Sequence, residues 1–535
     1  MGGVKDSSIR QSLWFAITAV VLAAVARFSI FSPLGVAELA YCFLIPLALP
    51  DWSQHSKRLI FLFGWISGFL FWLPSIIWLR HVTVFGTIGL SAVLAVFTGL
   101  WLLYFGRSLQ PKWGDARGLL QAWRVPLLGA AFWVILEWSR TWVFWGFPWN
   151  PLSVSQANRP AVLSILPFTG GWGLSFLLVW INLALAQWLR SPFTRWEGKG
   201  YLPVSRRVPL VVMVPLGILL GSAGIYFWNV TKFVPSQPVR VGFVQPYATM
   251  KWEQSEVEAN LRRGWEETRN LKEDAPEIIL WPESATPVPV IGSLGLKEGV
   301  ENLAAYMGVP ILMGNMAFLE SEGVYENGVF WVDPSKGLAE EYYVKRKLVP
   351  FGEFIPFRRY IPFVETFVPI SLDCRPGERA YNFYFEDRGS GNEIEIGPLI
   401  CYEDVFPNIA RETVRAGADW LFVATNNSWY GEEAGAYQHA NHAVIRAVEN
   451  RRPVLRSGNG GWSGWIDEWG NIRREVVDNR GSIYFQGGEV VPIVSDLRFQ
   501  DHLTFYVRWG NWFVWACITI VMIELIGRLL HRQNT

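Results

Sequence analysis

Long apolar stretches separated by short polar joints occupy the first 235 residues of the chain. A helix needs about 20 apolar residues to cross the hydrocarbon core of a bilayer. Seven stretches reach or approach this length, and an eighth lies near the end of the chain: 11–31, 34–50, 59–79, 84–106, 124–146, 161–189, 208–230 and 509–530. The pattern predicts a membrane domain with seven transmembrane helices over 1–235, and a C-terminal transmembrane helix with a tail over 506–535.

The pattern changes at about residue 236. Short runs of β-branched residues predict strands at Val239–Gln245, Glu277–Trp281, Val309–Asn315, Gly328–Asp333, Glu395–Cys401, Trp420–Thr425, Pro453–Ser457 and Trp462–Asp467. Polar helical stretches alternate with them at about 252–272, 295–307, 405–416 and 436–450. This alternation predicts an α/β layered domain over 236–505, with helices packed on sheets.

The basic residues of the joints indicate an orientation, because cytoplasmic loops are enriched in Lys and Arg. One set of joints carries only Arg80, Arg140 and Arg159. The other set carries Lys5, Arg10, Lys57, Arg58, Arg107, Lys112, Arg117, Arg124, Arg190, Arg195, Lys199, Arg206, Arg207, Arg528 and Arg532. We therefore predict a cytoplasmic N-terminus and, after seven crossings, residues 236–505 outside the cytoplasm.

Composition supports a lipid bilayer as a partner and gives no sign of nucleic acid. The chain is 51% hydrophobic and only 17% charged, whereas ordinary soluble domains are about 25% charged. Its 30 tryptophans suit a membrane–water interface. The formal charge of +1 provides no basic surface for nucleic acid. The four cysteines are too few for a disulfide framework.

Candidate chemistry lies where two predicted strands end. Glu283 follows the strand Glu277–Trp281, and Cys401 ends the strand Glu395–Cys401. Functional sites in α/β sheets gather at the carboxyl ends of strands, so the two side chains could face one cleft. A free thiol has a pKa of about 8.5 and needs a base to attack an ester. Glu283 could be that base, and Lys345 could stabilise the resulting oxyanion.

Each of these residues also has a plainer interpretation. A cysteine at a strand end is usually a small buried hydrophobe. A glutamate after a strand is usually a helix cap, and a lysine beside Arg346 and Lys347 is usually a solvated charge. The occurrence of all three with distinctive neighbours, in one order along the chain, favours a catalytic role.

The motifs carry a resemblance to a known family. They are Trp-Pro-Glu at 281–283, Lys345 followed by Leu-Val-Pro-Phe-Gly-Glu at 348–353, and Ile-Cys-Tyr-Glu at 400–403. They resemble the Glu–Lys–Cys triad of the nitrilase superfamily, and the whole chain resembles its membrane branch, the apolipoprotein N-acyltransferases. Residues 425–431, Arg446, Glu449 and Arg452 match as well. The resemblance implies a multispan α-helical membrane domain and an extracytoplasmic nitrilase-like αββα sandwich.

The resemblance also implies a role for each matching residue. Glu283 would be the general base, Lys345 the stabiliser of the intermediate, and Cys401 the acylated nucleophile. Glu353 would be an additional glutamate of the site, with Tyr402 and Glu403 supporting Cys401. Other matches are Trp252, which would lie on an arm near the active-site entrance, and Tyr325 and Asn327, which would line the cleft.

The activity implied is a ping-pong acyl transfer in the bacterial inner membrane, with the catalytic domain in the periplasm. A glycerophospholipid, with phosphatidylethanolamine expected, would acylate Cys401. The acceptor would be the N-terminal amine of S-diacylglyceryl-cysteine on an apolipoprotein. No metal or other cofactor is implied, and we expect a monomer.

Two other functions use the same sequence features. A membrane-anchored amidase or hydrolase would use the same triad with water as the acceptor. A transporter or lipid-binding scaffold could carry an inactive enzyme domain. The fate of the acyl group separates transfer from hydrolysis, and activity that survives Cys401→Ser would indicate the scaffold.

Several residues fall outside the family pattern or have no assigned role. The segment 457–462 departs from the usual family sequence, and Cys374 is not part of it. His439 and His442 are three residues apart on a predicted helix, but no third ligand is spaced as zinc requires. Arg27 and Glu137 are charges within or near spans, where charged residues are either functional or reach toward the interface.

Overall fold

The computed structural model describes residues 2–110, 119–190, 208–248, 254–360, 373–389 and 391–533. The chain forms two compact units. A helical unit contains Met1–Trp228 and Asn511–Thr535, and a second unit contains Asn229–Gly510. Each unit is described by itself below.

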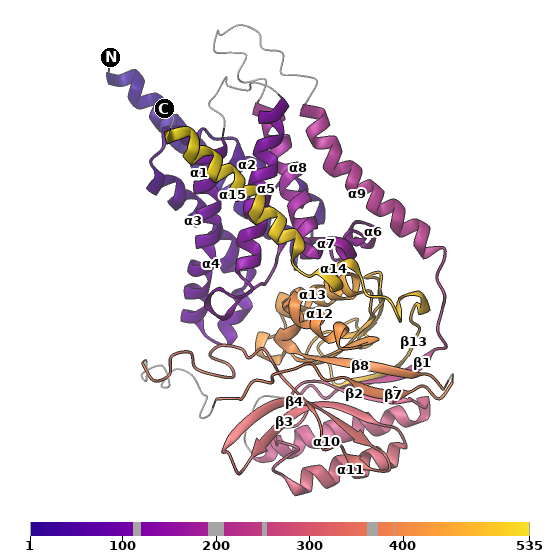
Figure 1. Ribbon diagram of the computed structural model, residues 1–535. Coiled ribbons are helices and arrows are strands. Elements are labelled where there is room, and N and C mark those ends of the chain that lie inside the picture. Colours follow the sequence, from indigo (N-terminus) through magenta and orange to yellow (C-terminus); the bar gives the residue numbers. More distant parts are fainter. Residues whose placement is uncertain are drawn as a thin grey trace. The chain divides into compact units, whose positions relative to one another are not determined.

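Long helices build the helical unit (Figure 1). They are α1 (Gly2–Ser29), α3 (Lys57–Ser75), α4 (Val84–Tyr104), α5 (Leu119–Ser139), α8 (Gly171–Arg190), α9 (Val208–Val230) and α15 (Trp512–Gln533). Among the described residues, six helical stretches are long and apolar enough to span a membrane: Ser12–Ser29, Lys57–Ser75, Val84–Leu109, Gly171–Arg190, Leu210–Val230 and Trp512–Leu530. Helix α5 is of similar length but carries Arg124 and Glu137.

The second predicted span, 34–50, is wrong as a transmembrane helix. The structure has only the 3₁₀ turn η1 (Ala37–Tyr41) and the short α2 (Ile45–Ala48) there, because Gly35 and three prolines in 33–50 oppose a continuous helix. The segment nevertheless runs back along α1. Helices α1 and α3 are parallel, since Val20 contacts Ser67 and Arg27 lies over Phe71.

Polar side chains satisfy the backbone of this returning segment. Asn182 on α8 accepts a hydrogen bond from the Leu44 N–H at 2.7 Å and donates one to the Ala40 carbonyl at 2.8 Å. Gln156 Nε2 donates to the Ala37 carbonyl at 3.0 Å. Irregular backbone among membrane helices requires such partners, because lipid offers none.

The sixth predicted span, 161–189, is also shorter than expected. Its first part forms the short helices α6 (Pro160–Leu163) and α7 (Leu166–Thr169), and α8 begins only at Gly171. Gly170 has a φ of +64° and a ψ of −174°, a conformation that glycine adopts readily and that ends α7. The long helix therefore starts ten residues after the apolar run does.

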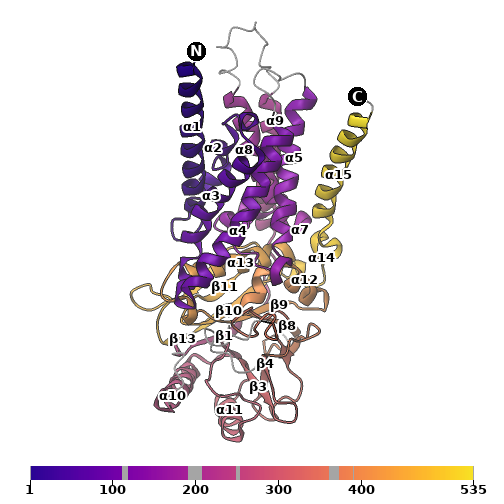
Figure 2. The ribbon, with the colours of Figure 1, turned by 90° about the vertical axis from the view of Figure 1, so that its left-hand side faces the viewer.

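Helices α3 and α4 lie side by side (Figure 2), and small residues form their contact. A Cβ atom at Gly64 would lie 2.8 Å from the Thr98 carbonyl, and one at Gly68 would lie 2.8 Å from the Ala95 Cα. No side chain fits at such distances. The glycine pair therefore brings the two helices together, as small residues four apart do in membrane proteins.

The second unit contains two sheets. One has the strand order β13-β1-β2-β3-β4-β5, with β6 also paired to β4. Its strands are β1 (Val239–Gln245), β2 (Ile278–Trp281), β3 (Ile311–Leu319), β4 (Val324–Asp333), β5 (Gly337–Leu338), β6 (Tyr343–Val344) and β13 (Gly487–Ile493). The other has the order β12-β11-β10-β9-β8-β7. Its strands are β7 (Phe383–Glu386), β8 (Glu393–Ile400), β9 (Trp420–Asn426), β10 (Val454–Asn459), β11 (Ser463–Ile466) and β12 (Ile472–Val476).

The sheets pack face to face and helices cover their outer faces (Figure 1). Ile278 and Leu280 of β2 enter the core shared with β8 and β9. Ile279 and Trp281, which point the other way, enter a core with helix α11. Helices α10 (Gln254–Asn270) and α11 (Leu294–Met307) cover the first sheet, and α12 (Pro407–Arg415) and α13 (Ala434–Asn450) cover the second. The predicted αββα sandwich is confirmed.

Candidate active site

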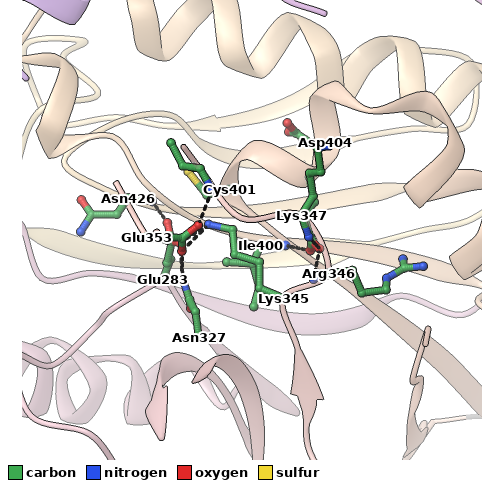
Figure 3. Close-up of polar contacts among 12 residues, drawn as sticks. Glu283, Asn327, Lys345, Arg346, Lys347, Glu353, Ile400, Cys401, Asp404 and Asn426 are labelled. Atoms are coloured by element: carbon green, nitrogen blue, oxygen red, sulfur yellow. Dashed lines mark hydrogen bonds and ion pairs between the residues drawn. The ribbon is translucent and has the colours of Figure 1, made fainter. Parts of the chain in front are cut away.

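Three strand ends bring the predicted triad together (Figure 3). Glu283 lies in the turn after β2, Lys345 directly follows β6, and Cys401 directly follows β8. The turn that holds Glu283 needs a glycine beside it. A Cβ atom at Gly314 on β3 would lie 2.7 Å from the Pro282 carbonyl and 2.8 Å from the Glu283 Cα.

Two carboxylates hold the ammonium group of Lys345. Lys345 Nζ lies 3.0 Å from Glu283 Oε1 and 2.9 Å from Glu353 Oε1. The Asn327 amide bridges the same two oxygens, with its Nδ2 at 2.8 Å from Glu283 and 2.7 Å from Glu353. Val349 N–H donates to the other Glu353 oxygen at 2.8 Å. The site therefore has a fixed cation whose neighbours are themselves fixed.

Cys401 has an unusual backbone conformation. Its φ is +47°, in the left-handed region that side chains disfavour, and the residue is 6% exposed. It begins the 3₁₀ turn η10 (Cys401–Val405) directly after the strand. The thiol interacts with Thr425 and Tyr430, and the N–H of Asn426 donates to Glu283 Oε2 at 3.1 Å. The thiol and the carboxylate therefore share one neighbourhood.

The electrostatics keep the resting thiol protonated. Burial raises the pKa of Cys401 to about 12, and the charge of Glu283 acts in the same direction. Lys345 lowers this pKa without reversing the shift. Burial alone would lower the pKa of Lys345 itself, but Glu283 and Glu353 reverse this and place it well above its ordinary value. A protonated thiol beside a charged ammonium needs a base before it can attack.

Glu403 connects the backbones on either side of the site. One of its oxygens accepts from the Arg346 and Lys347 N–H groups at 2.6 and 3.1 Å. The other accepts from the Ile400 N–H and the Tyr343 hydroxyl, both at 2.7 Å. The residues next to Lys345 and Cys401 are thus joined to one buried carboxylate. Burial raises the pKa of Glu403, although Arg346 opposes the shift.

The other predicted site residues have different surroundings. Tyr402 is buried and packs edge-on against Phe406, with ring centroids 5.0 Å apart. Tyr325 lies on the same face of β4 as Asn327, because residues two apart on a strand share a face. The centroid of its ring lies 4.7 Å from that of the Phe318 ring. Trp252 lies outside the described residues. Asn327, by contrast, contacts Glu283 of the triad directly.

Cys374 lies near the site but is a free thiol, as is Cys401. Its N–H donates to the Glu353 carbonyl at 2.8 Å. Burial raises the pKa of Cys374 to about 12, and the Glu353 carboxylate acts in the same direction. The residue thus helps to hold the backbone of Glu353.

Sequence reasoning missed the contact of His439 with the backbone of Cys401. His439 Nε2 lies 3.1 Å from the Cys401 carbonyl oxygen and 2.8 Å from Asp404 Oδ1. No group of three or more metal-ligating side chains occurs in the described part of the chain. The helical spacing of His439 and His442 raised only a weak metal hypothesis, and no motif signalled a partner so distant in the sequence.

Comparisons with known proteins cover both units. The family model of the apolipoprotein N-acyltransferase N-terminal domain matches residues 23–185, and that of carbon-nitrogen hydrolase matches residues 240–483. Among solved structures, an amidase from Nesterenkonia sp. is 17% identical with a TM-score of 0.37, and covers 52% of this chain and 98% of its own. Saccharomyces cerevisiae Nit3, of the nitrilase superfamily, is 18% identical with a TM-score of 0.36, and covers 51% and 95%.

Curated relatives extend over nearly the full length. The apolipoprotein N-acyltransferase of Rickettsia prowazekii is 28% identical over 91% of this chain and 92% of its own. That of Pseudomonas aeruginosa PAO1 is 27% identical over 94% and 93%. The enzyme of Geobacter metallireducens is 30% identical and is matched over 99% of this chain and 98% of its own. With a relative of this similarity matched from end to end, and family models for both halves, the chain belongs to the apolipoprotein N-acyltransferase family.

Proposed function

We propose that the chain transfers a fatty acyl group from a glycerophospholipid, through a thioester on Cys401, to the N-terminal amine of S-diacylglyceryl-cysteine on an apolipoprotein. Membership of the family supports lipoprotein N-acylation in general. The observation that carries the finer proposal is the Lys345 ammonium, held by Glu283 and Glu353 beside a buried thiol. A base, a cation and a nucleophile are the groups that acyl transfer through a covalent intermediate requires.

In the first half-reaction, Glu283 accepts the thiol proton as Cys401 Sγ attacks the ester carbonyl carbon of the donor. Lys345 Nζ stabilises the oxyanion that forms. When the intermediate collapses, the C–O bond breaks and the leaving alkoxide takes the proton from Glu283. A lysophospholipid departs and the acyl chain remains on sulfur.

In the second half-reaction, the acceptor amine attacks the thioester carbonyl and Glu283 accepts an amine proton. Lys345 again faces the oxyanion. The C–S bond then breaks, the amide is released, and the proton on Glu283 returns to the thiolate. Each substrate reacts with a different form of the enzyme, so the kinetics are ping-pong.

We further propose that 1–235 and 506–535 lie in the inner membrane and that 236–505 is a periplasmic catalytic domain. In the described part of the chain, six helices are long and apolar enough to span a bilayer, which supports membrane insertion. The uneven distribution of Lys and Arg supports the orientation. Both substrates carry their reactive groups near the surface of a bilayer, which gives a membrane anchor a physical purpose. We expect phosphatidylethanolamine as the donor, a monomeric enzyme, Trp252 near the entrance of the cleft, and Tyr325 in its lining.

Mass spectrometry of the purified protein after incubation with phosphatidylethanolamine tests the proposal. We expect a mass increase of one acyl group on Cys401, which hydroxylamine removes, and transfer of that group to a diacylglyceryl peptide. Cys374→Ser is a matched control, because it removes the neighbouring free thiol, and it should still be acylated. Amide product without acylation of Cys401 would refute the mechanism, and release of free fatty acid alone would identify a hydrolase.

A further inference from the structure

A buried polar network contacts the backbone of the nucleophile from the side of α13. His439 lies on this helix, with Nε2 3.1 Å from the Cys401 carbonyl oxygen and 2.8 Å from Asp404 Oδ1. Arg456 on β10 forms an ion pair with the other oxygen of Asp404. The side chains of all three residues are 0% exposed. None of them has a part in the acyl-transfer steps above.

The partners of the imidazole define its protonation. Nε2 faces two oxygen acceptors and therefore carries the hydrogen. Nδ1 lies 3.2 Å from the Asn427 amide nitrogen, which is a donor, so Nδ1 accepts. A neutral ring with its proton on Nε2 satisfies both nitrogens.

The charges around the ring also favour its neutral form. Burial lowers the pKa of His439, and Arg456 acts in the same direction against the opposing effect of Asp404. Burial alone would raise the pKa of Asp404, but the charge of Arg456 and the hydrogen bond from His439 bring it below its ordinary value. The network is therefore a neutral imidazole between an ionised carboxylate and a backbone carbonyl.

The carbonyl that His439 contacts belongs to the strained residue. Cys401 has a φ of +47°, and a residue with a Cβ atom adopts this conformation only when its surroundings hold it there. Its backbone conformation sets the direction of the Cα–Cβ bond and hence the position of Sγ. A hydrogen bond to its carbonyl, from a ring anchored by Asp404, fixes the orientation of the peptide group that follows.

We propose that His439 is a positioning residue that holds the Cys401 backbone in its reactive conformation, with Asp404 orienting the imidazole and Arg456 keeping Asp404 in place. The proposal rests on Cys401 being the nucleophile of the proposed function. His439 donates a hydrogen bond and does not transfer a proton. Its loss should therefore slow acylation without changing how tightly the donor lipid binds.

Two substitutions separate this role from simple packing. In His439→Gln the amide nitrogen can occupy the position of Nε2 and donate to the Cys401 carbonyl. In His439→Leu no donor remains. His442→Leu is a matched control, because it removes another fully buried imidazole from the same helix, one turn further on.

The experiment measures single-turnover formation of the Cys401 thioester at increasing phosphatidylethanolamine, together with the unfolding midpoint of each variant. For His439→Leu we expect the maximal rate to fall about 100-fold, the loss that misplacement of a reacting group by about 1 Å can cause. The half-saturating lipid concentration should stay within about twofold of wild type. His439→Gln and His442→Leu should stay within about threefold of the wild-type rate.

Three results would overturn the proposal: an unimpaired His439→Leu, equal losses in His439→Leu and His442→Leu, or a loss in His439→Gln as large as in His439→Leu. If the leucine variant does not fold, His439→Asn replaces it, because its shorter amide does not reach the carbonyl; it should be slow while His439→Gln is fast. Wild-type protein that gains no acyl group refutes the proposed function itself. Normal wild-type acylation with unimpaired His439 variants refutes the positioning role alone.

Discussion

Lys345 in the second unit and Arg27 in the helical unit are both buried cations, yet different partners hold them. Lys345 is 1% exposed and lies 3.0 and 2.9 Å from two carboxylates. Arg27 is 6% exposed, and its guanidinium carbon lies 4.0 Å from the ring centre of Phe71 and 4.9 Å from that of Trp133. Its one hydrogen bond shown goes to the Thr98 hydroxyl at 3.1 Å.

The difference in partners indicates a difference in role. Carboxylates keep Lys345 charged and fix its position beside the Cys401 thiol, where the oxyanion of the proposed mechanism would form. Aromatic faces stabilise a cation through their quadrupoles. Such contacts account for a buried cation without a catalytic role. A buried charge in a membrane protein is therefore weak evidence of function until its neighbours are known.

The largest effect on the reaction rate should come from removing the charge of Lys345, and removal of the Arg27 charge provides the contrast. Lys345→Met should slow formation of the Cys401 thioester about 1000-fold, the upper range for loss of an oxyanion-stabilising group. Arg27→Met should leave the rate per folded molecule within about threefold of wild type. Its cost should appear in stability, at about 2 kcal/mol for a desolvated cation–π contact.

Single-turnover acylation and thermal unfolding of both variants in detergent test this contrast. A loss of rate in Arg27→Met as large as in Lys345→Met, in protein that remains folded, would contradict the distinction. Equal acylation by Lys345→Met and wild type would remove Lys345 from the mechanism.

Glu283→Gln should change two reactions of the same sulfur in opposite directions. Acylation by phospholipid should fall about 100-fold, because no base takes the thiol proton. Alkylation of Cys401 by iodoacetamide at pH 8 should become faster, because Glu283 raises the pKa of this thiol and its charge is gone. Parallel measurement of both rates checks the prediction, and a parallel decrease would show that Glu283 does not raise the thiol pKa.

Much of the second unit, Asn229–Gly510, could be predicted from local sequence. The strand ends that carry Glu283 and Cys401 follow from apolar runs that stop at a proline and at a helical stretch. The strand at 239–245 was predicted with its observed bounds, β1. The short strands β5, β6 and β7 and the last strands β12 and β13 were missed. Strands β5, β6 and β7 are very short, β12 is polar, and β13 begins with two glycines and contains a proline, so none shows a clear periodic pattern. Pairing with neighbouring strands stabilises them.

Tertiary contacts explain what local patterns could not supply. The irregular segment 34–50 exists because Asn182 and Gln156, far along the chain, satisfy its backbone. His439 meets Cys401 across 38 positions of sequence, and no local spacing encodes that distance. Asn327 bridging Glu283 and Glu353 was expected only as a residue of the cleft. In each case a side chain bonds to a partner that only folding brings near.

Glu468 is a buried carboxylate that offers a contrast with Glu283. Within the described residues, no ion pair joins its side chain to a cation as Lys345 is joined to Glu283. Burial raises the pKa of Glu468 from 4.5 to about 7. Between these pH values the folded protein keeps a proton that the unfolded chain releases, so stability falls as the pH rises. The loss amounts to about 3 kcal/mol by pH 7, at 1.36 kcal/mol per unit.

Glu468→Gln should therefore be more stable than wild type at pH 8, by about 3 kcal/mol, and similar to it near pH 4.5. Thermal unfolding of both proteins across this range measures the difference. A constant difference at all pH values would show that the carboxylate does not titrate as its burial implies.

The smallest effect should come from Arg27→Lys, which keeps the charge and removes the flat guanidinium. A compact ammonium cannot stack on Phe71 and Trp133 together, so we expect a loss of about 1 kcal/mol in stability and no change in acylation. A double-mutant cycle with Phe71→Leu isolates the contact, because the two losses should then be less than additive. Strict additivity would show that the ring does not stabilise the cation. The aromatic rings around Arg27 would then act only as packing. Of the two buried cations, Lys345 alone would be stabilised electrostatically by the partners compared here.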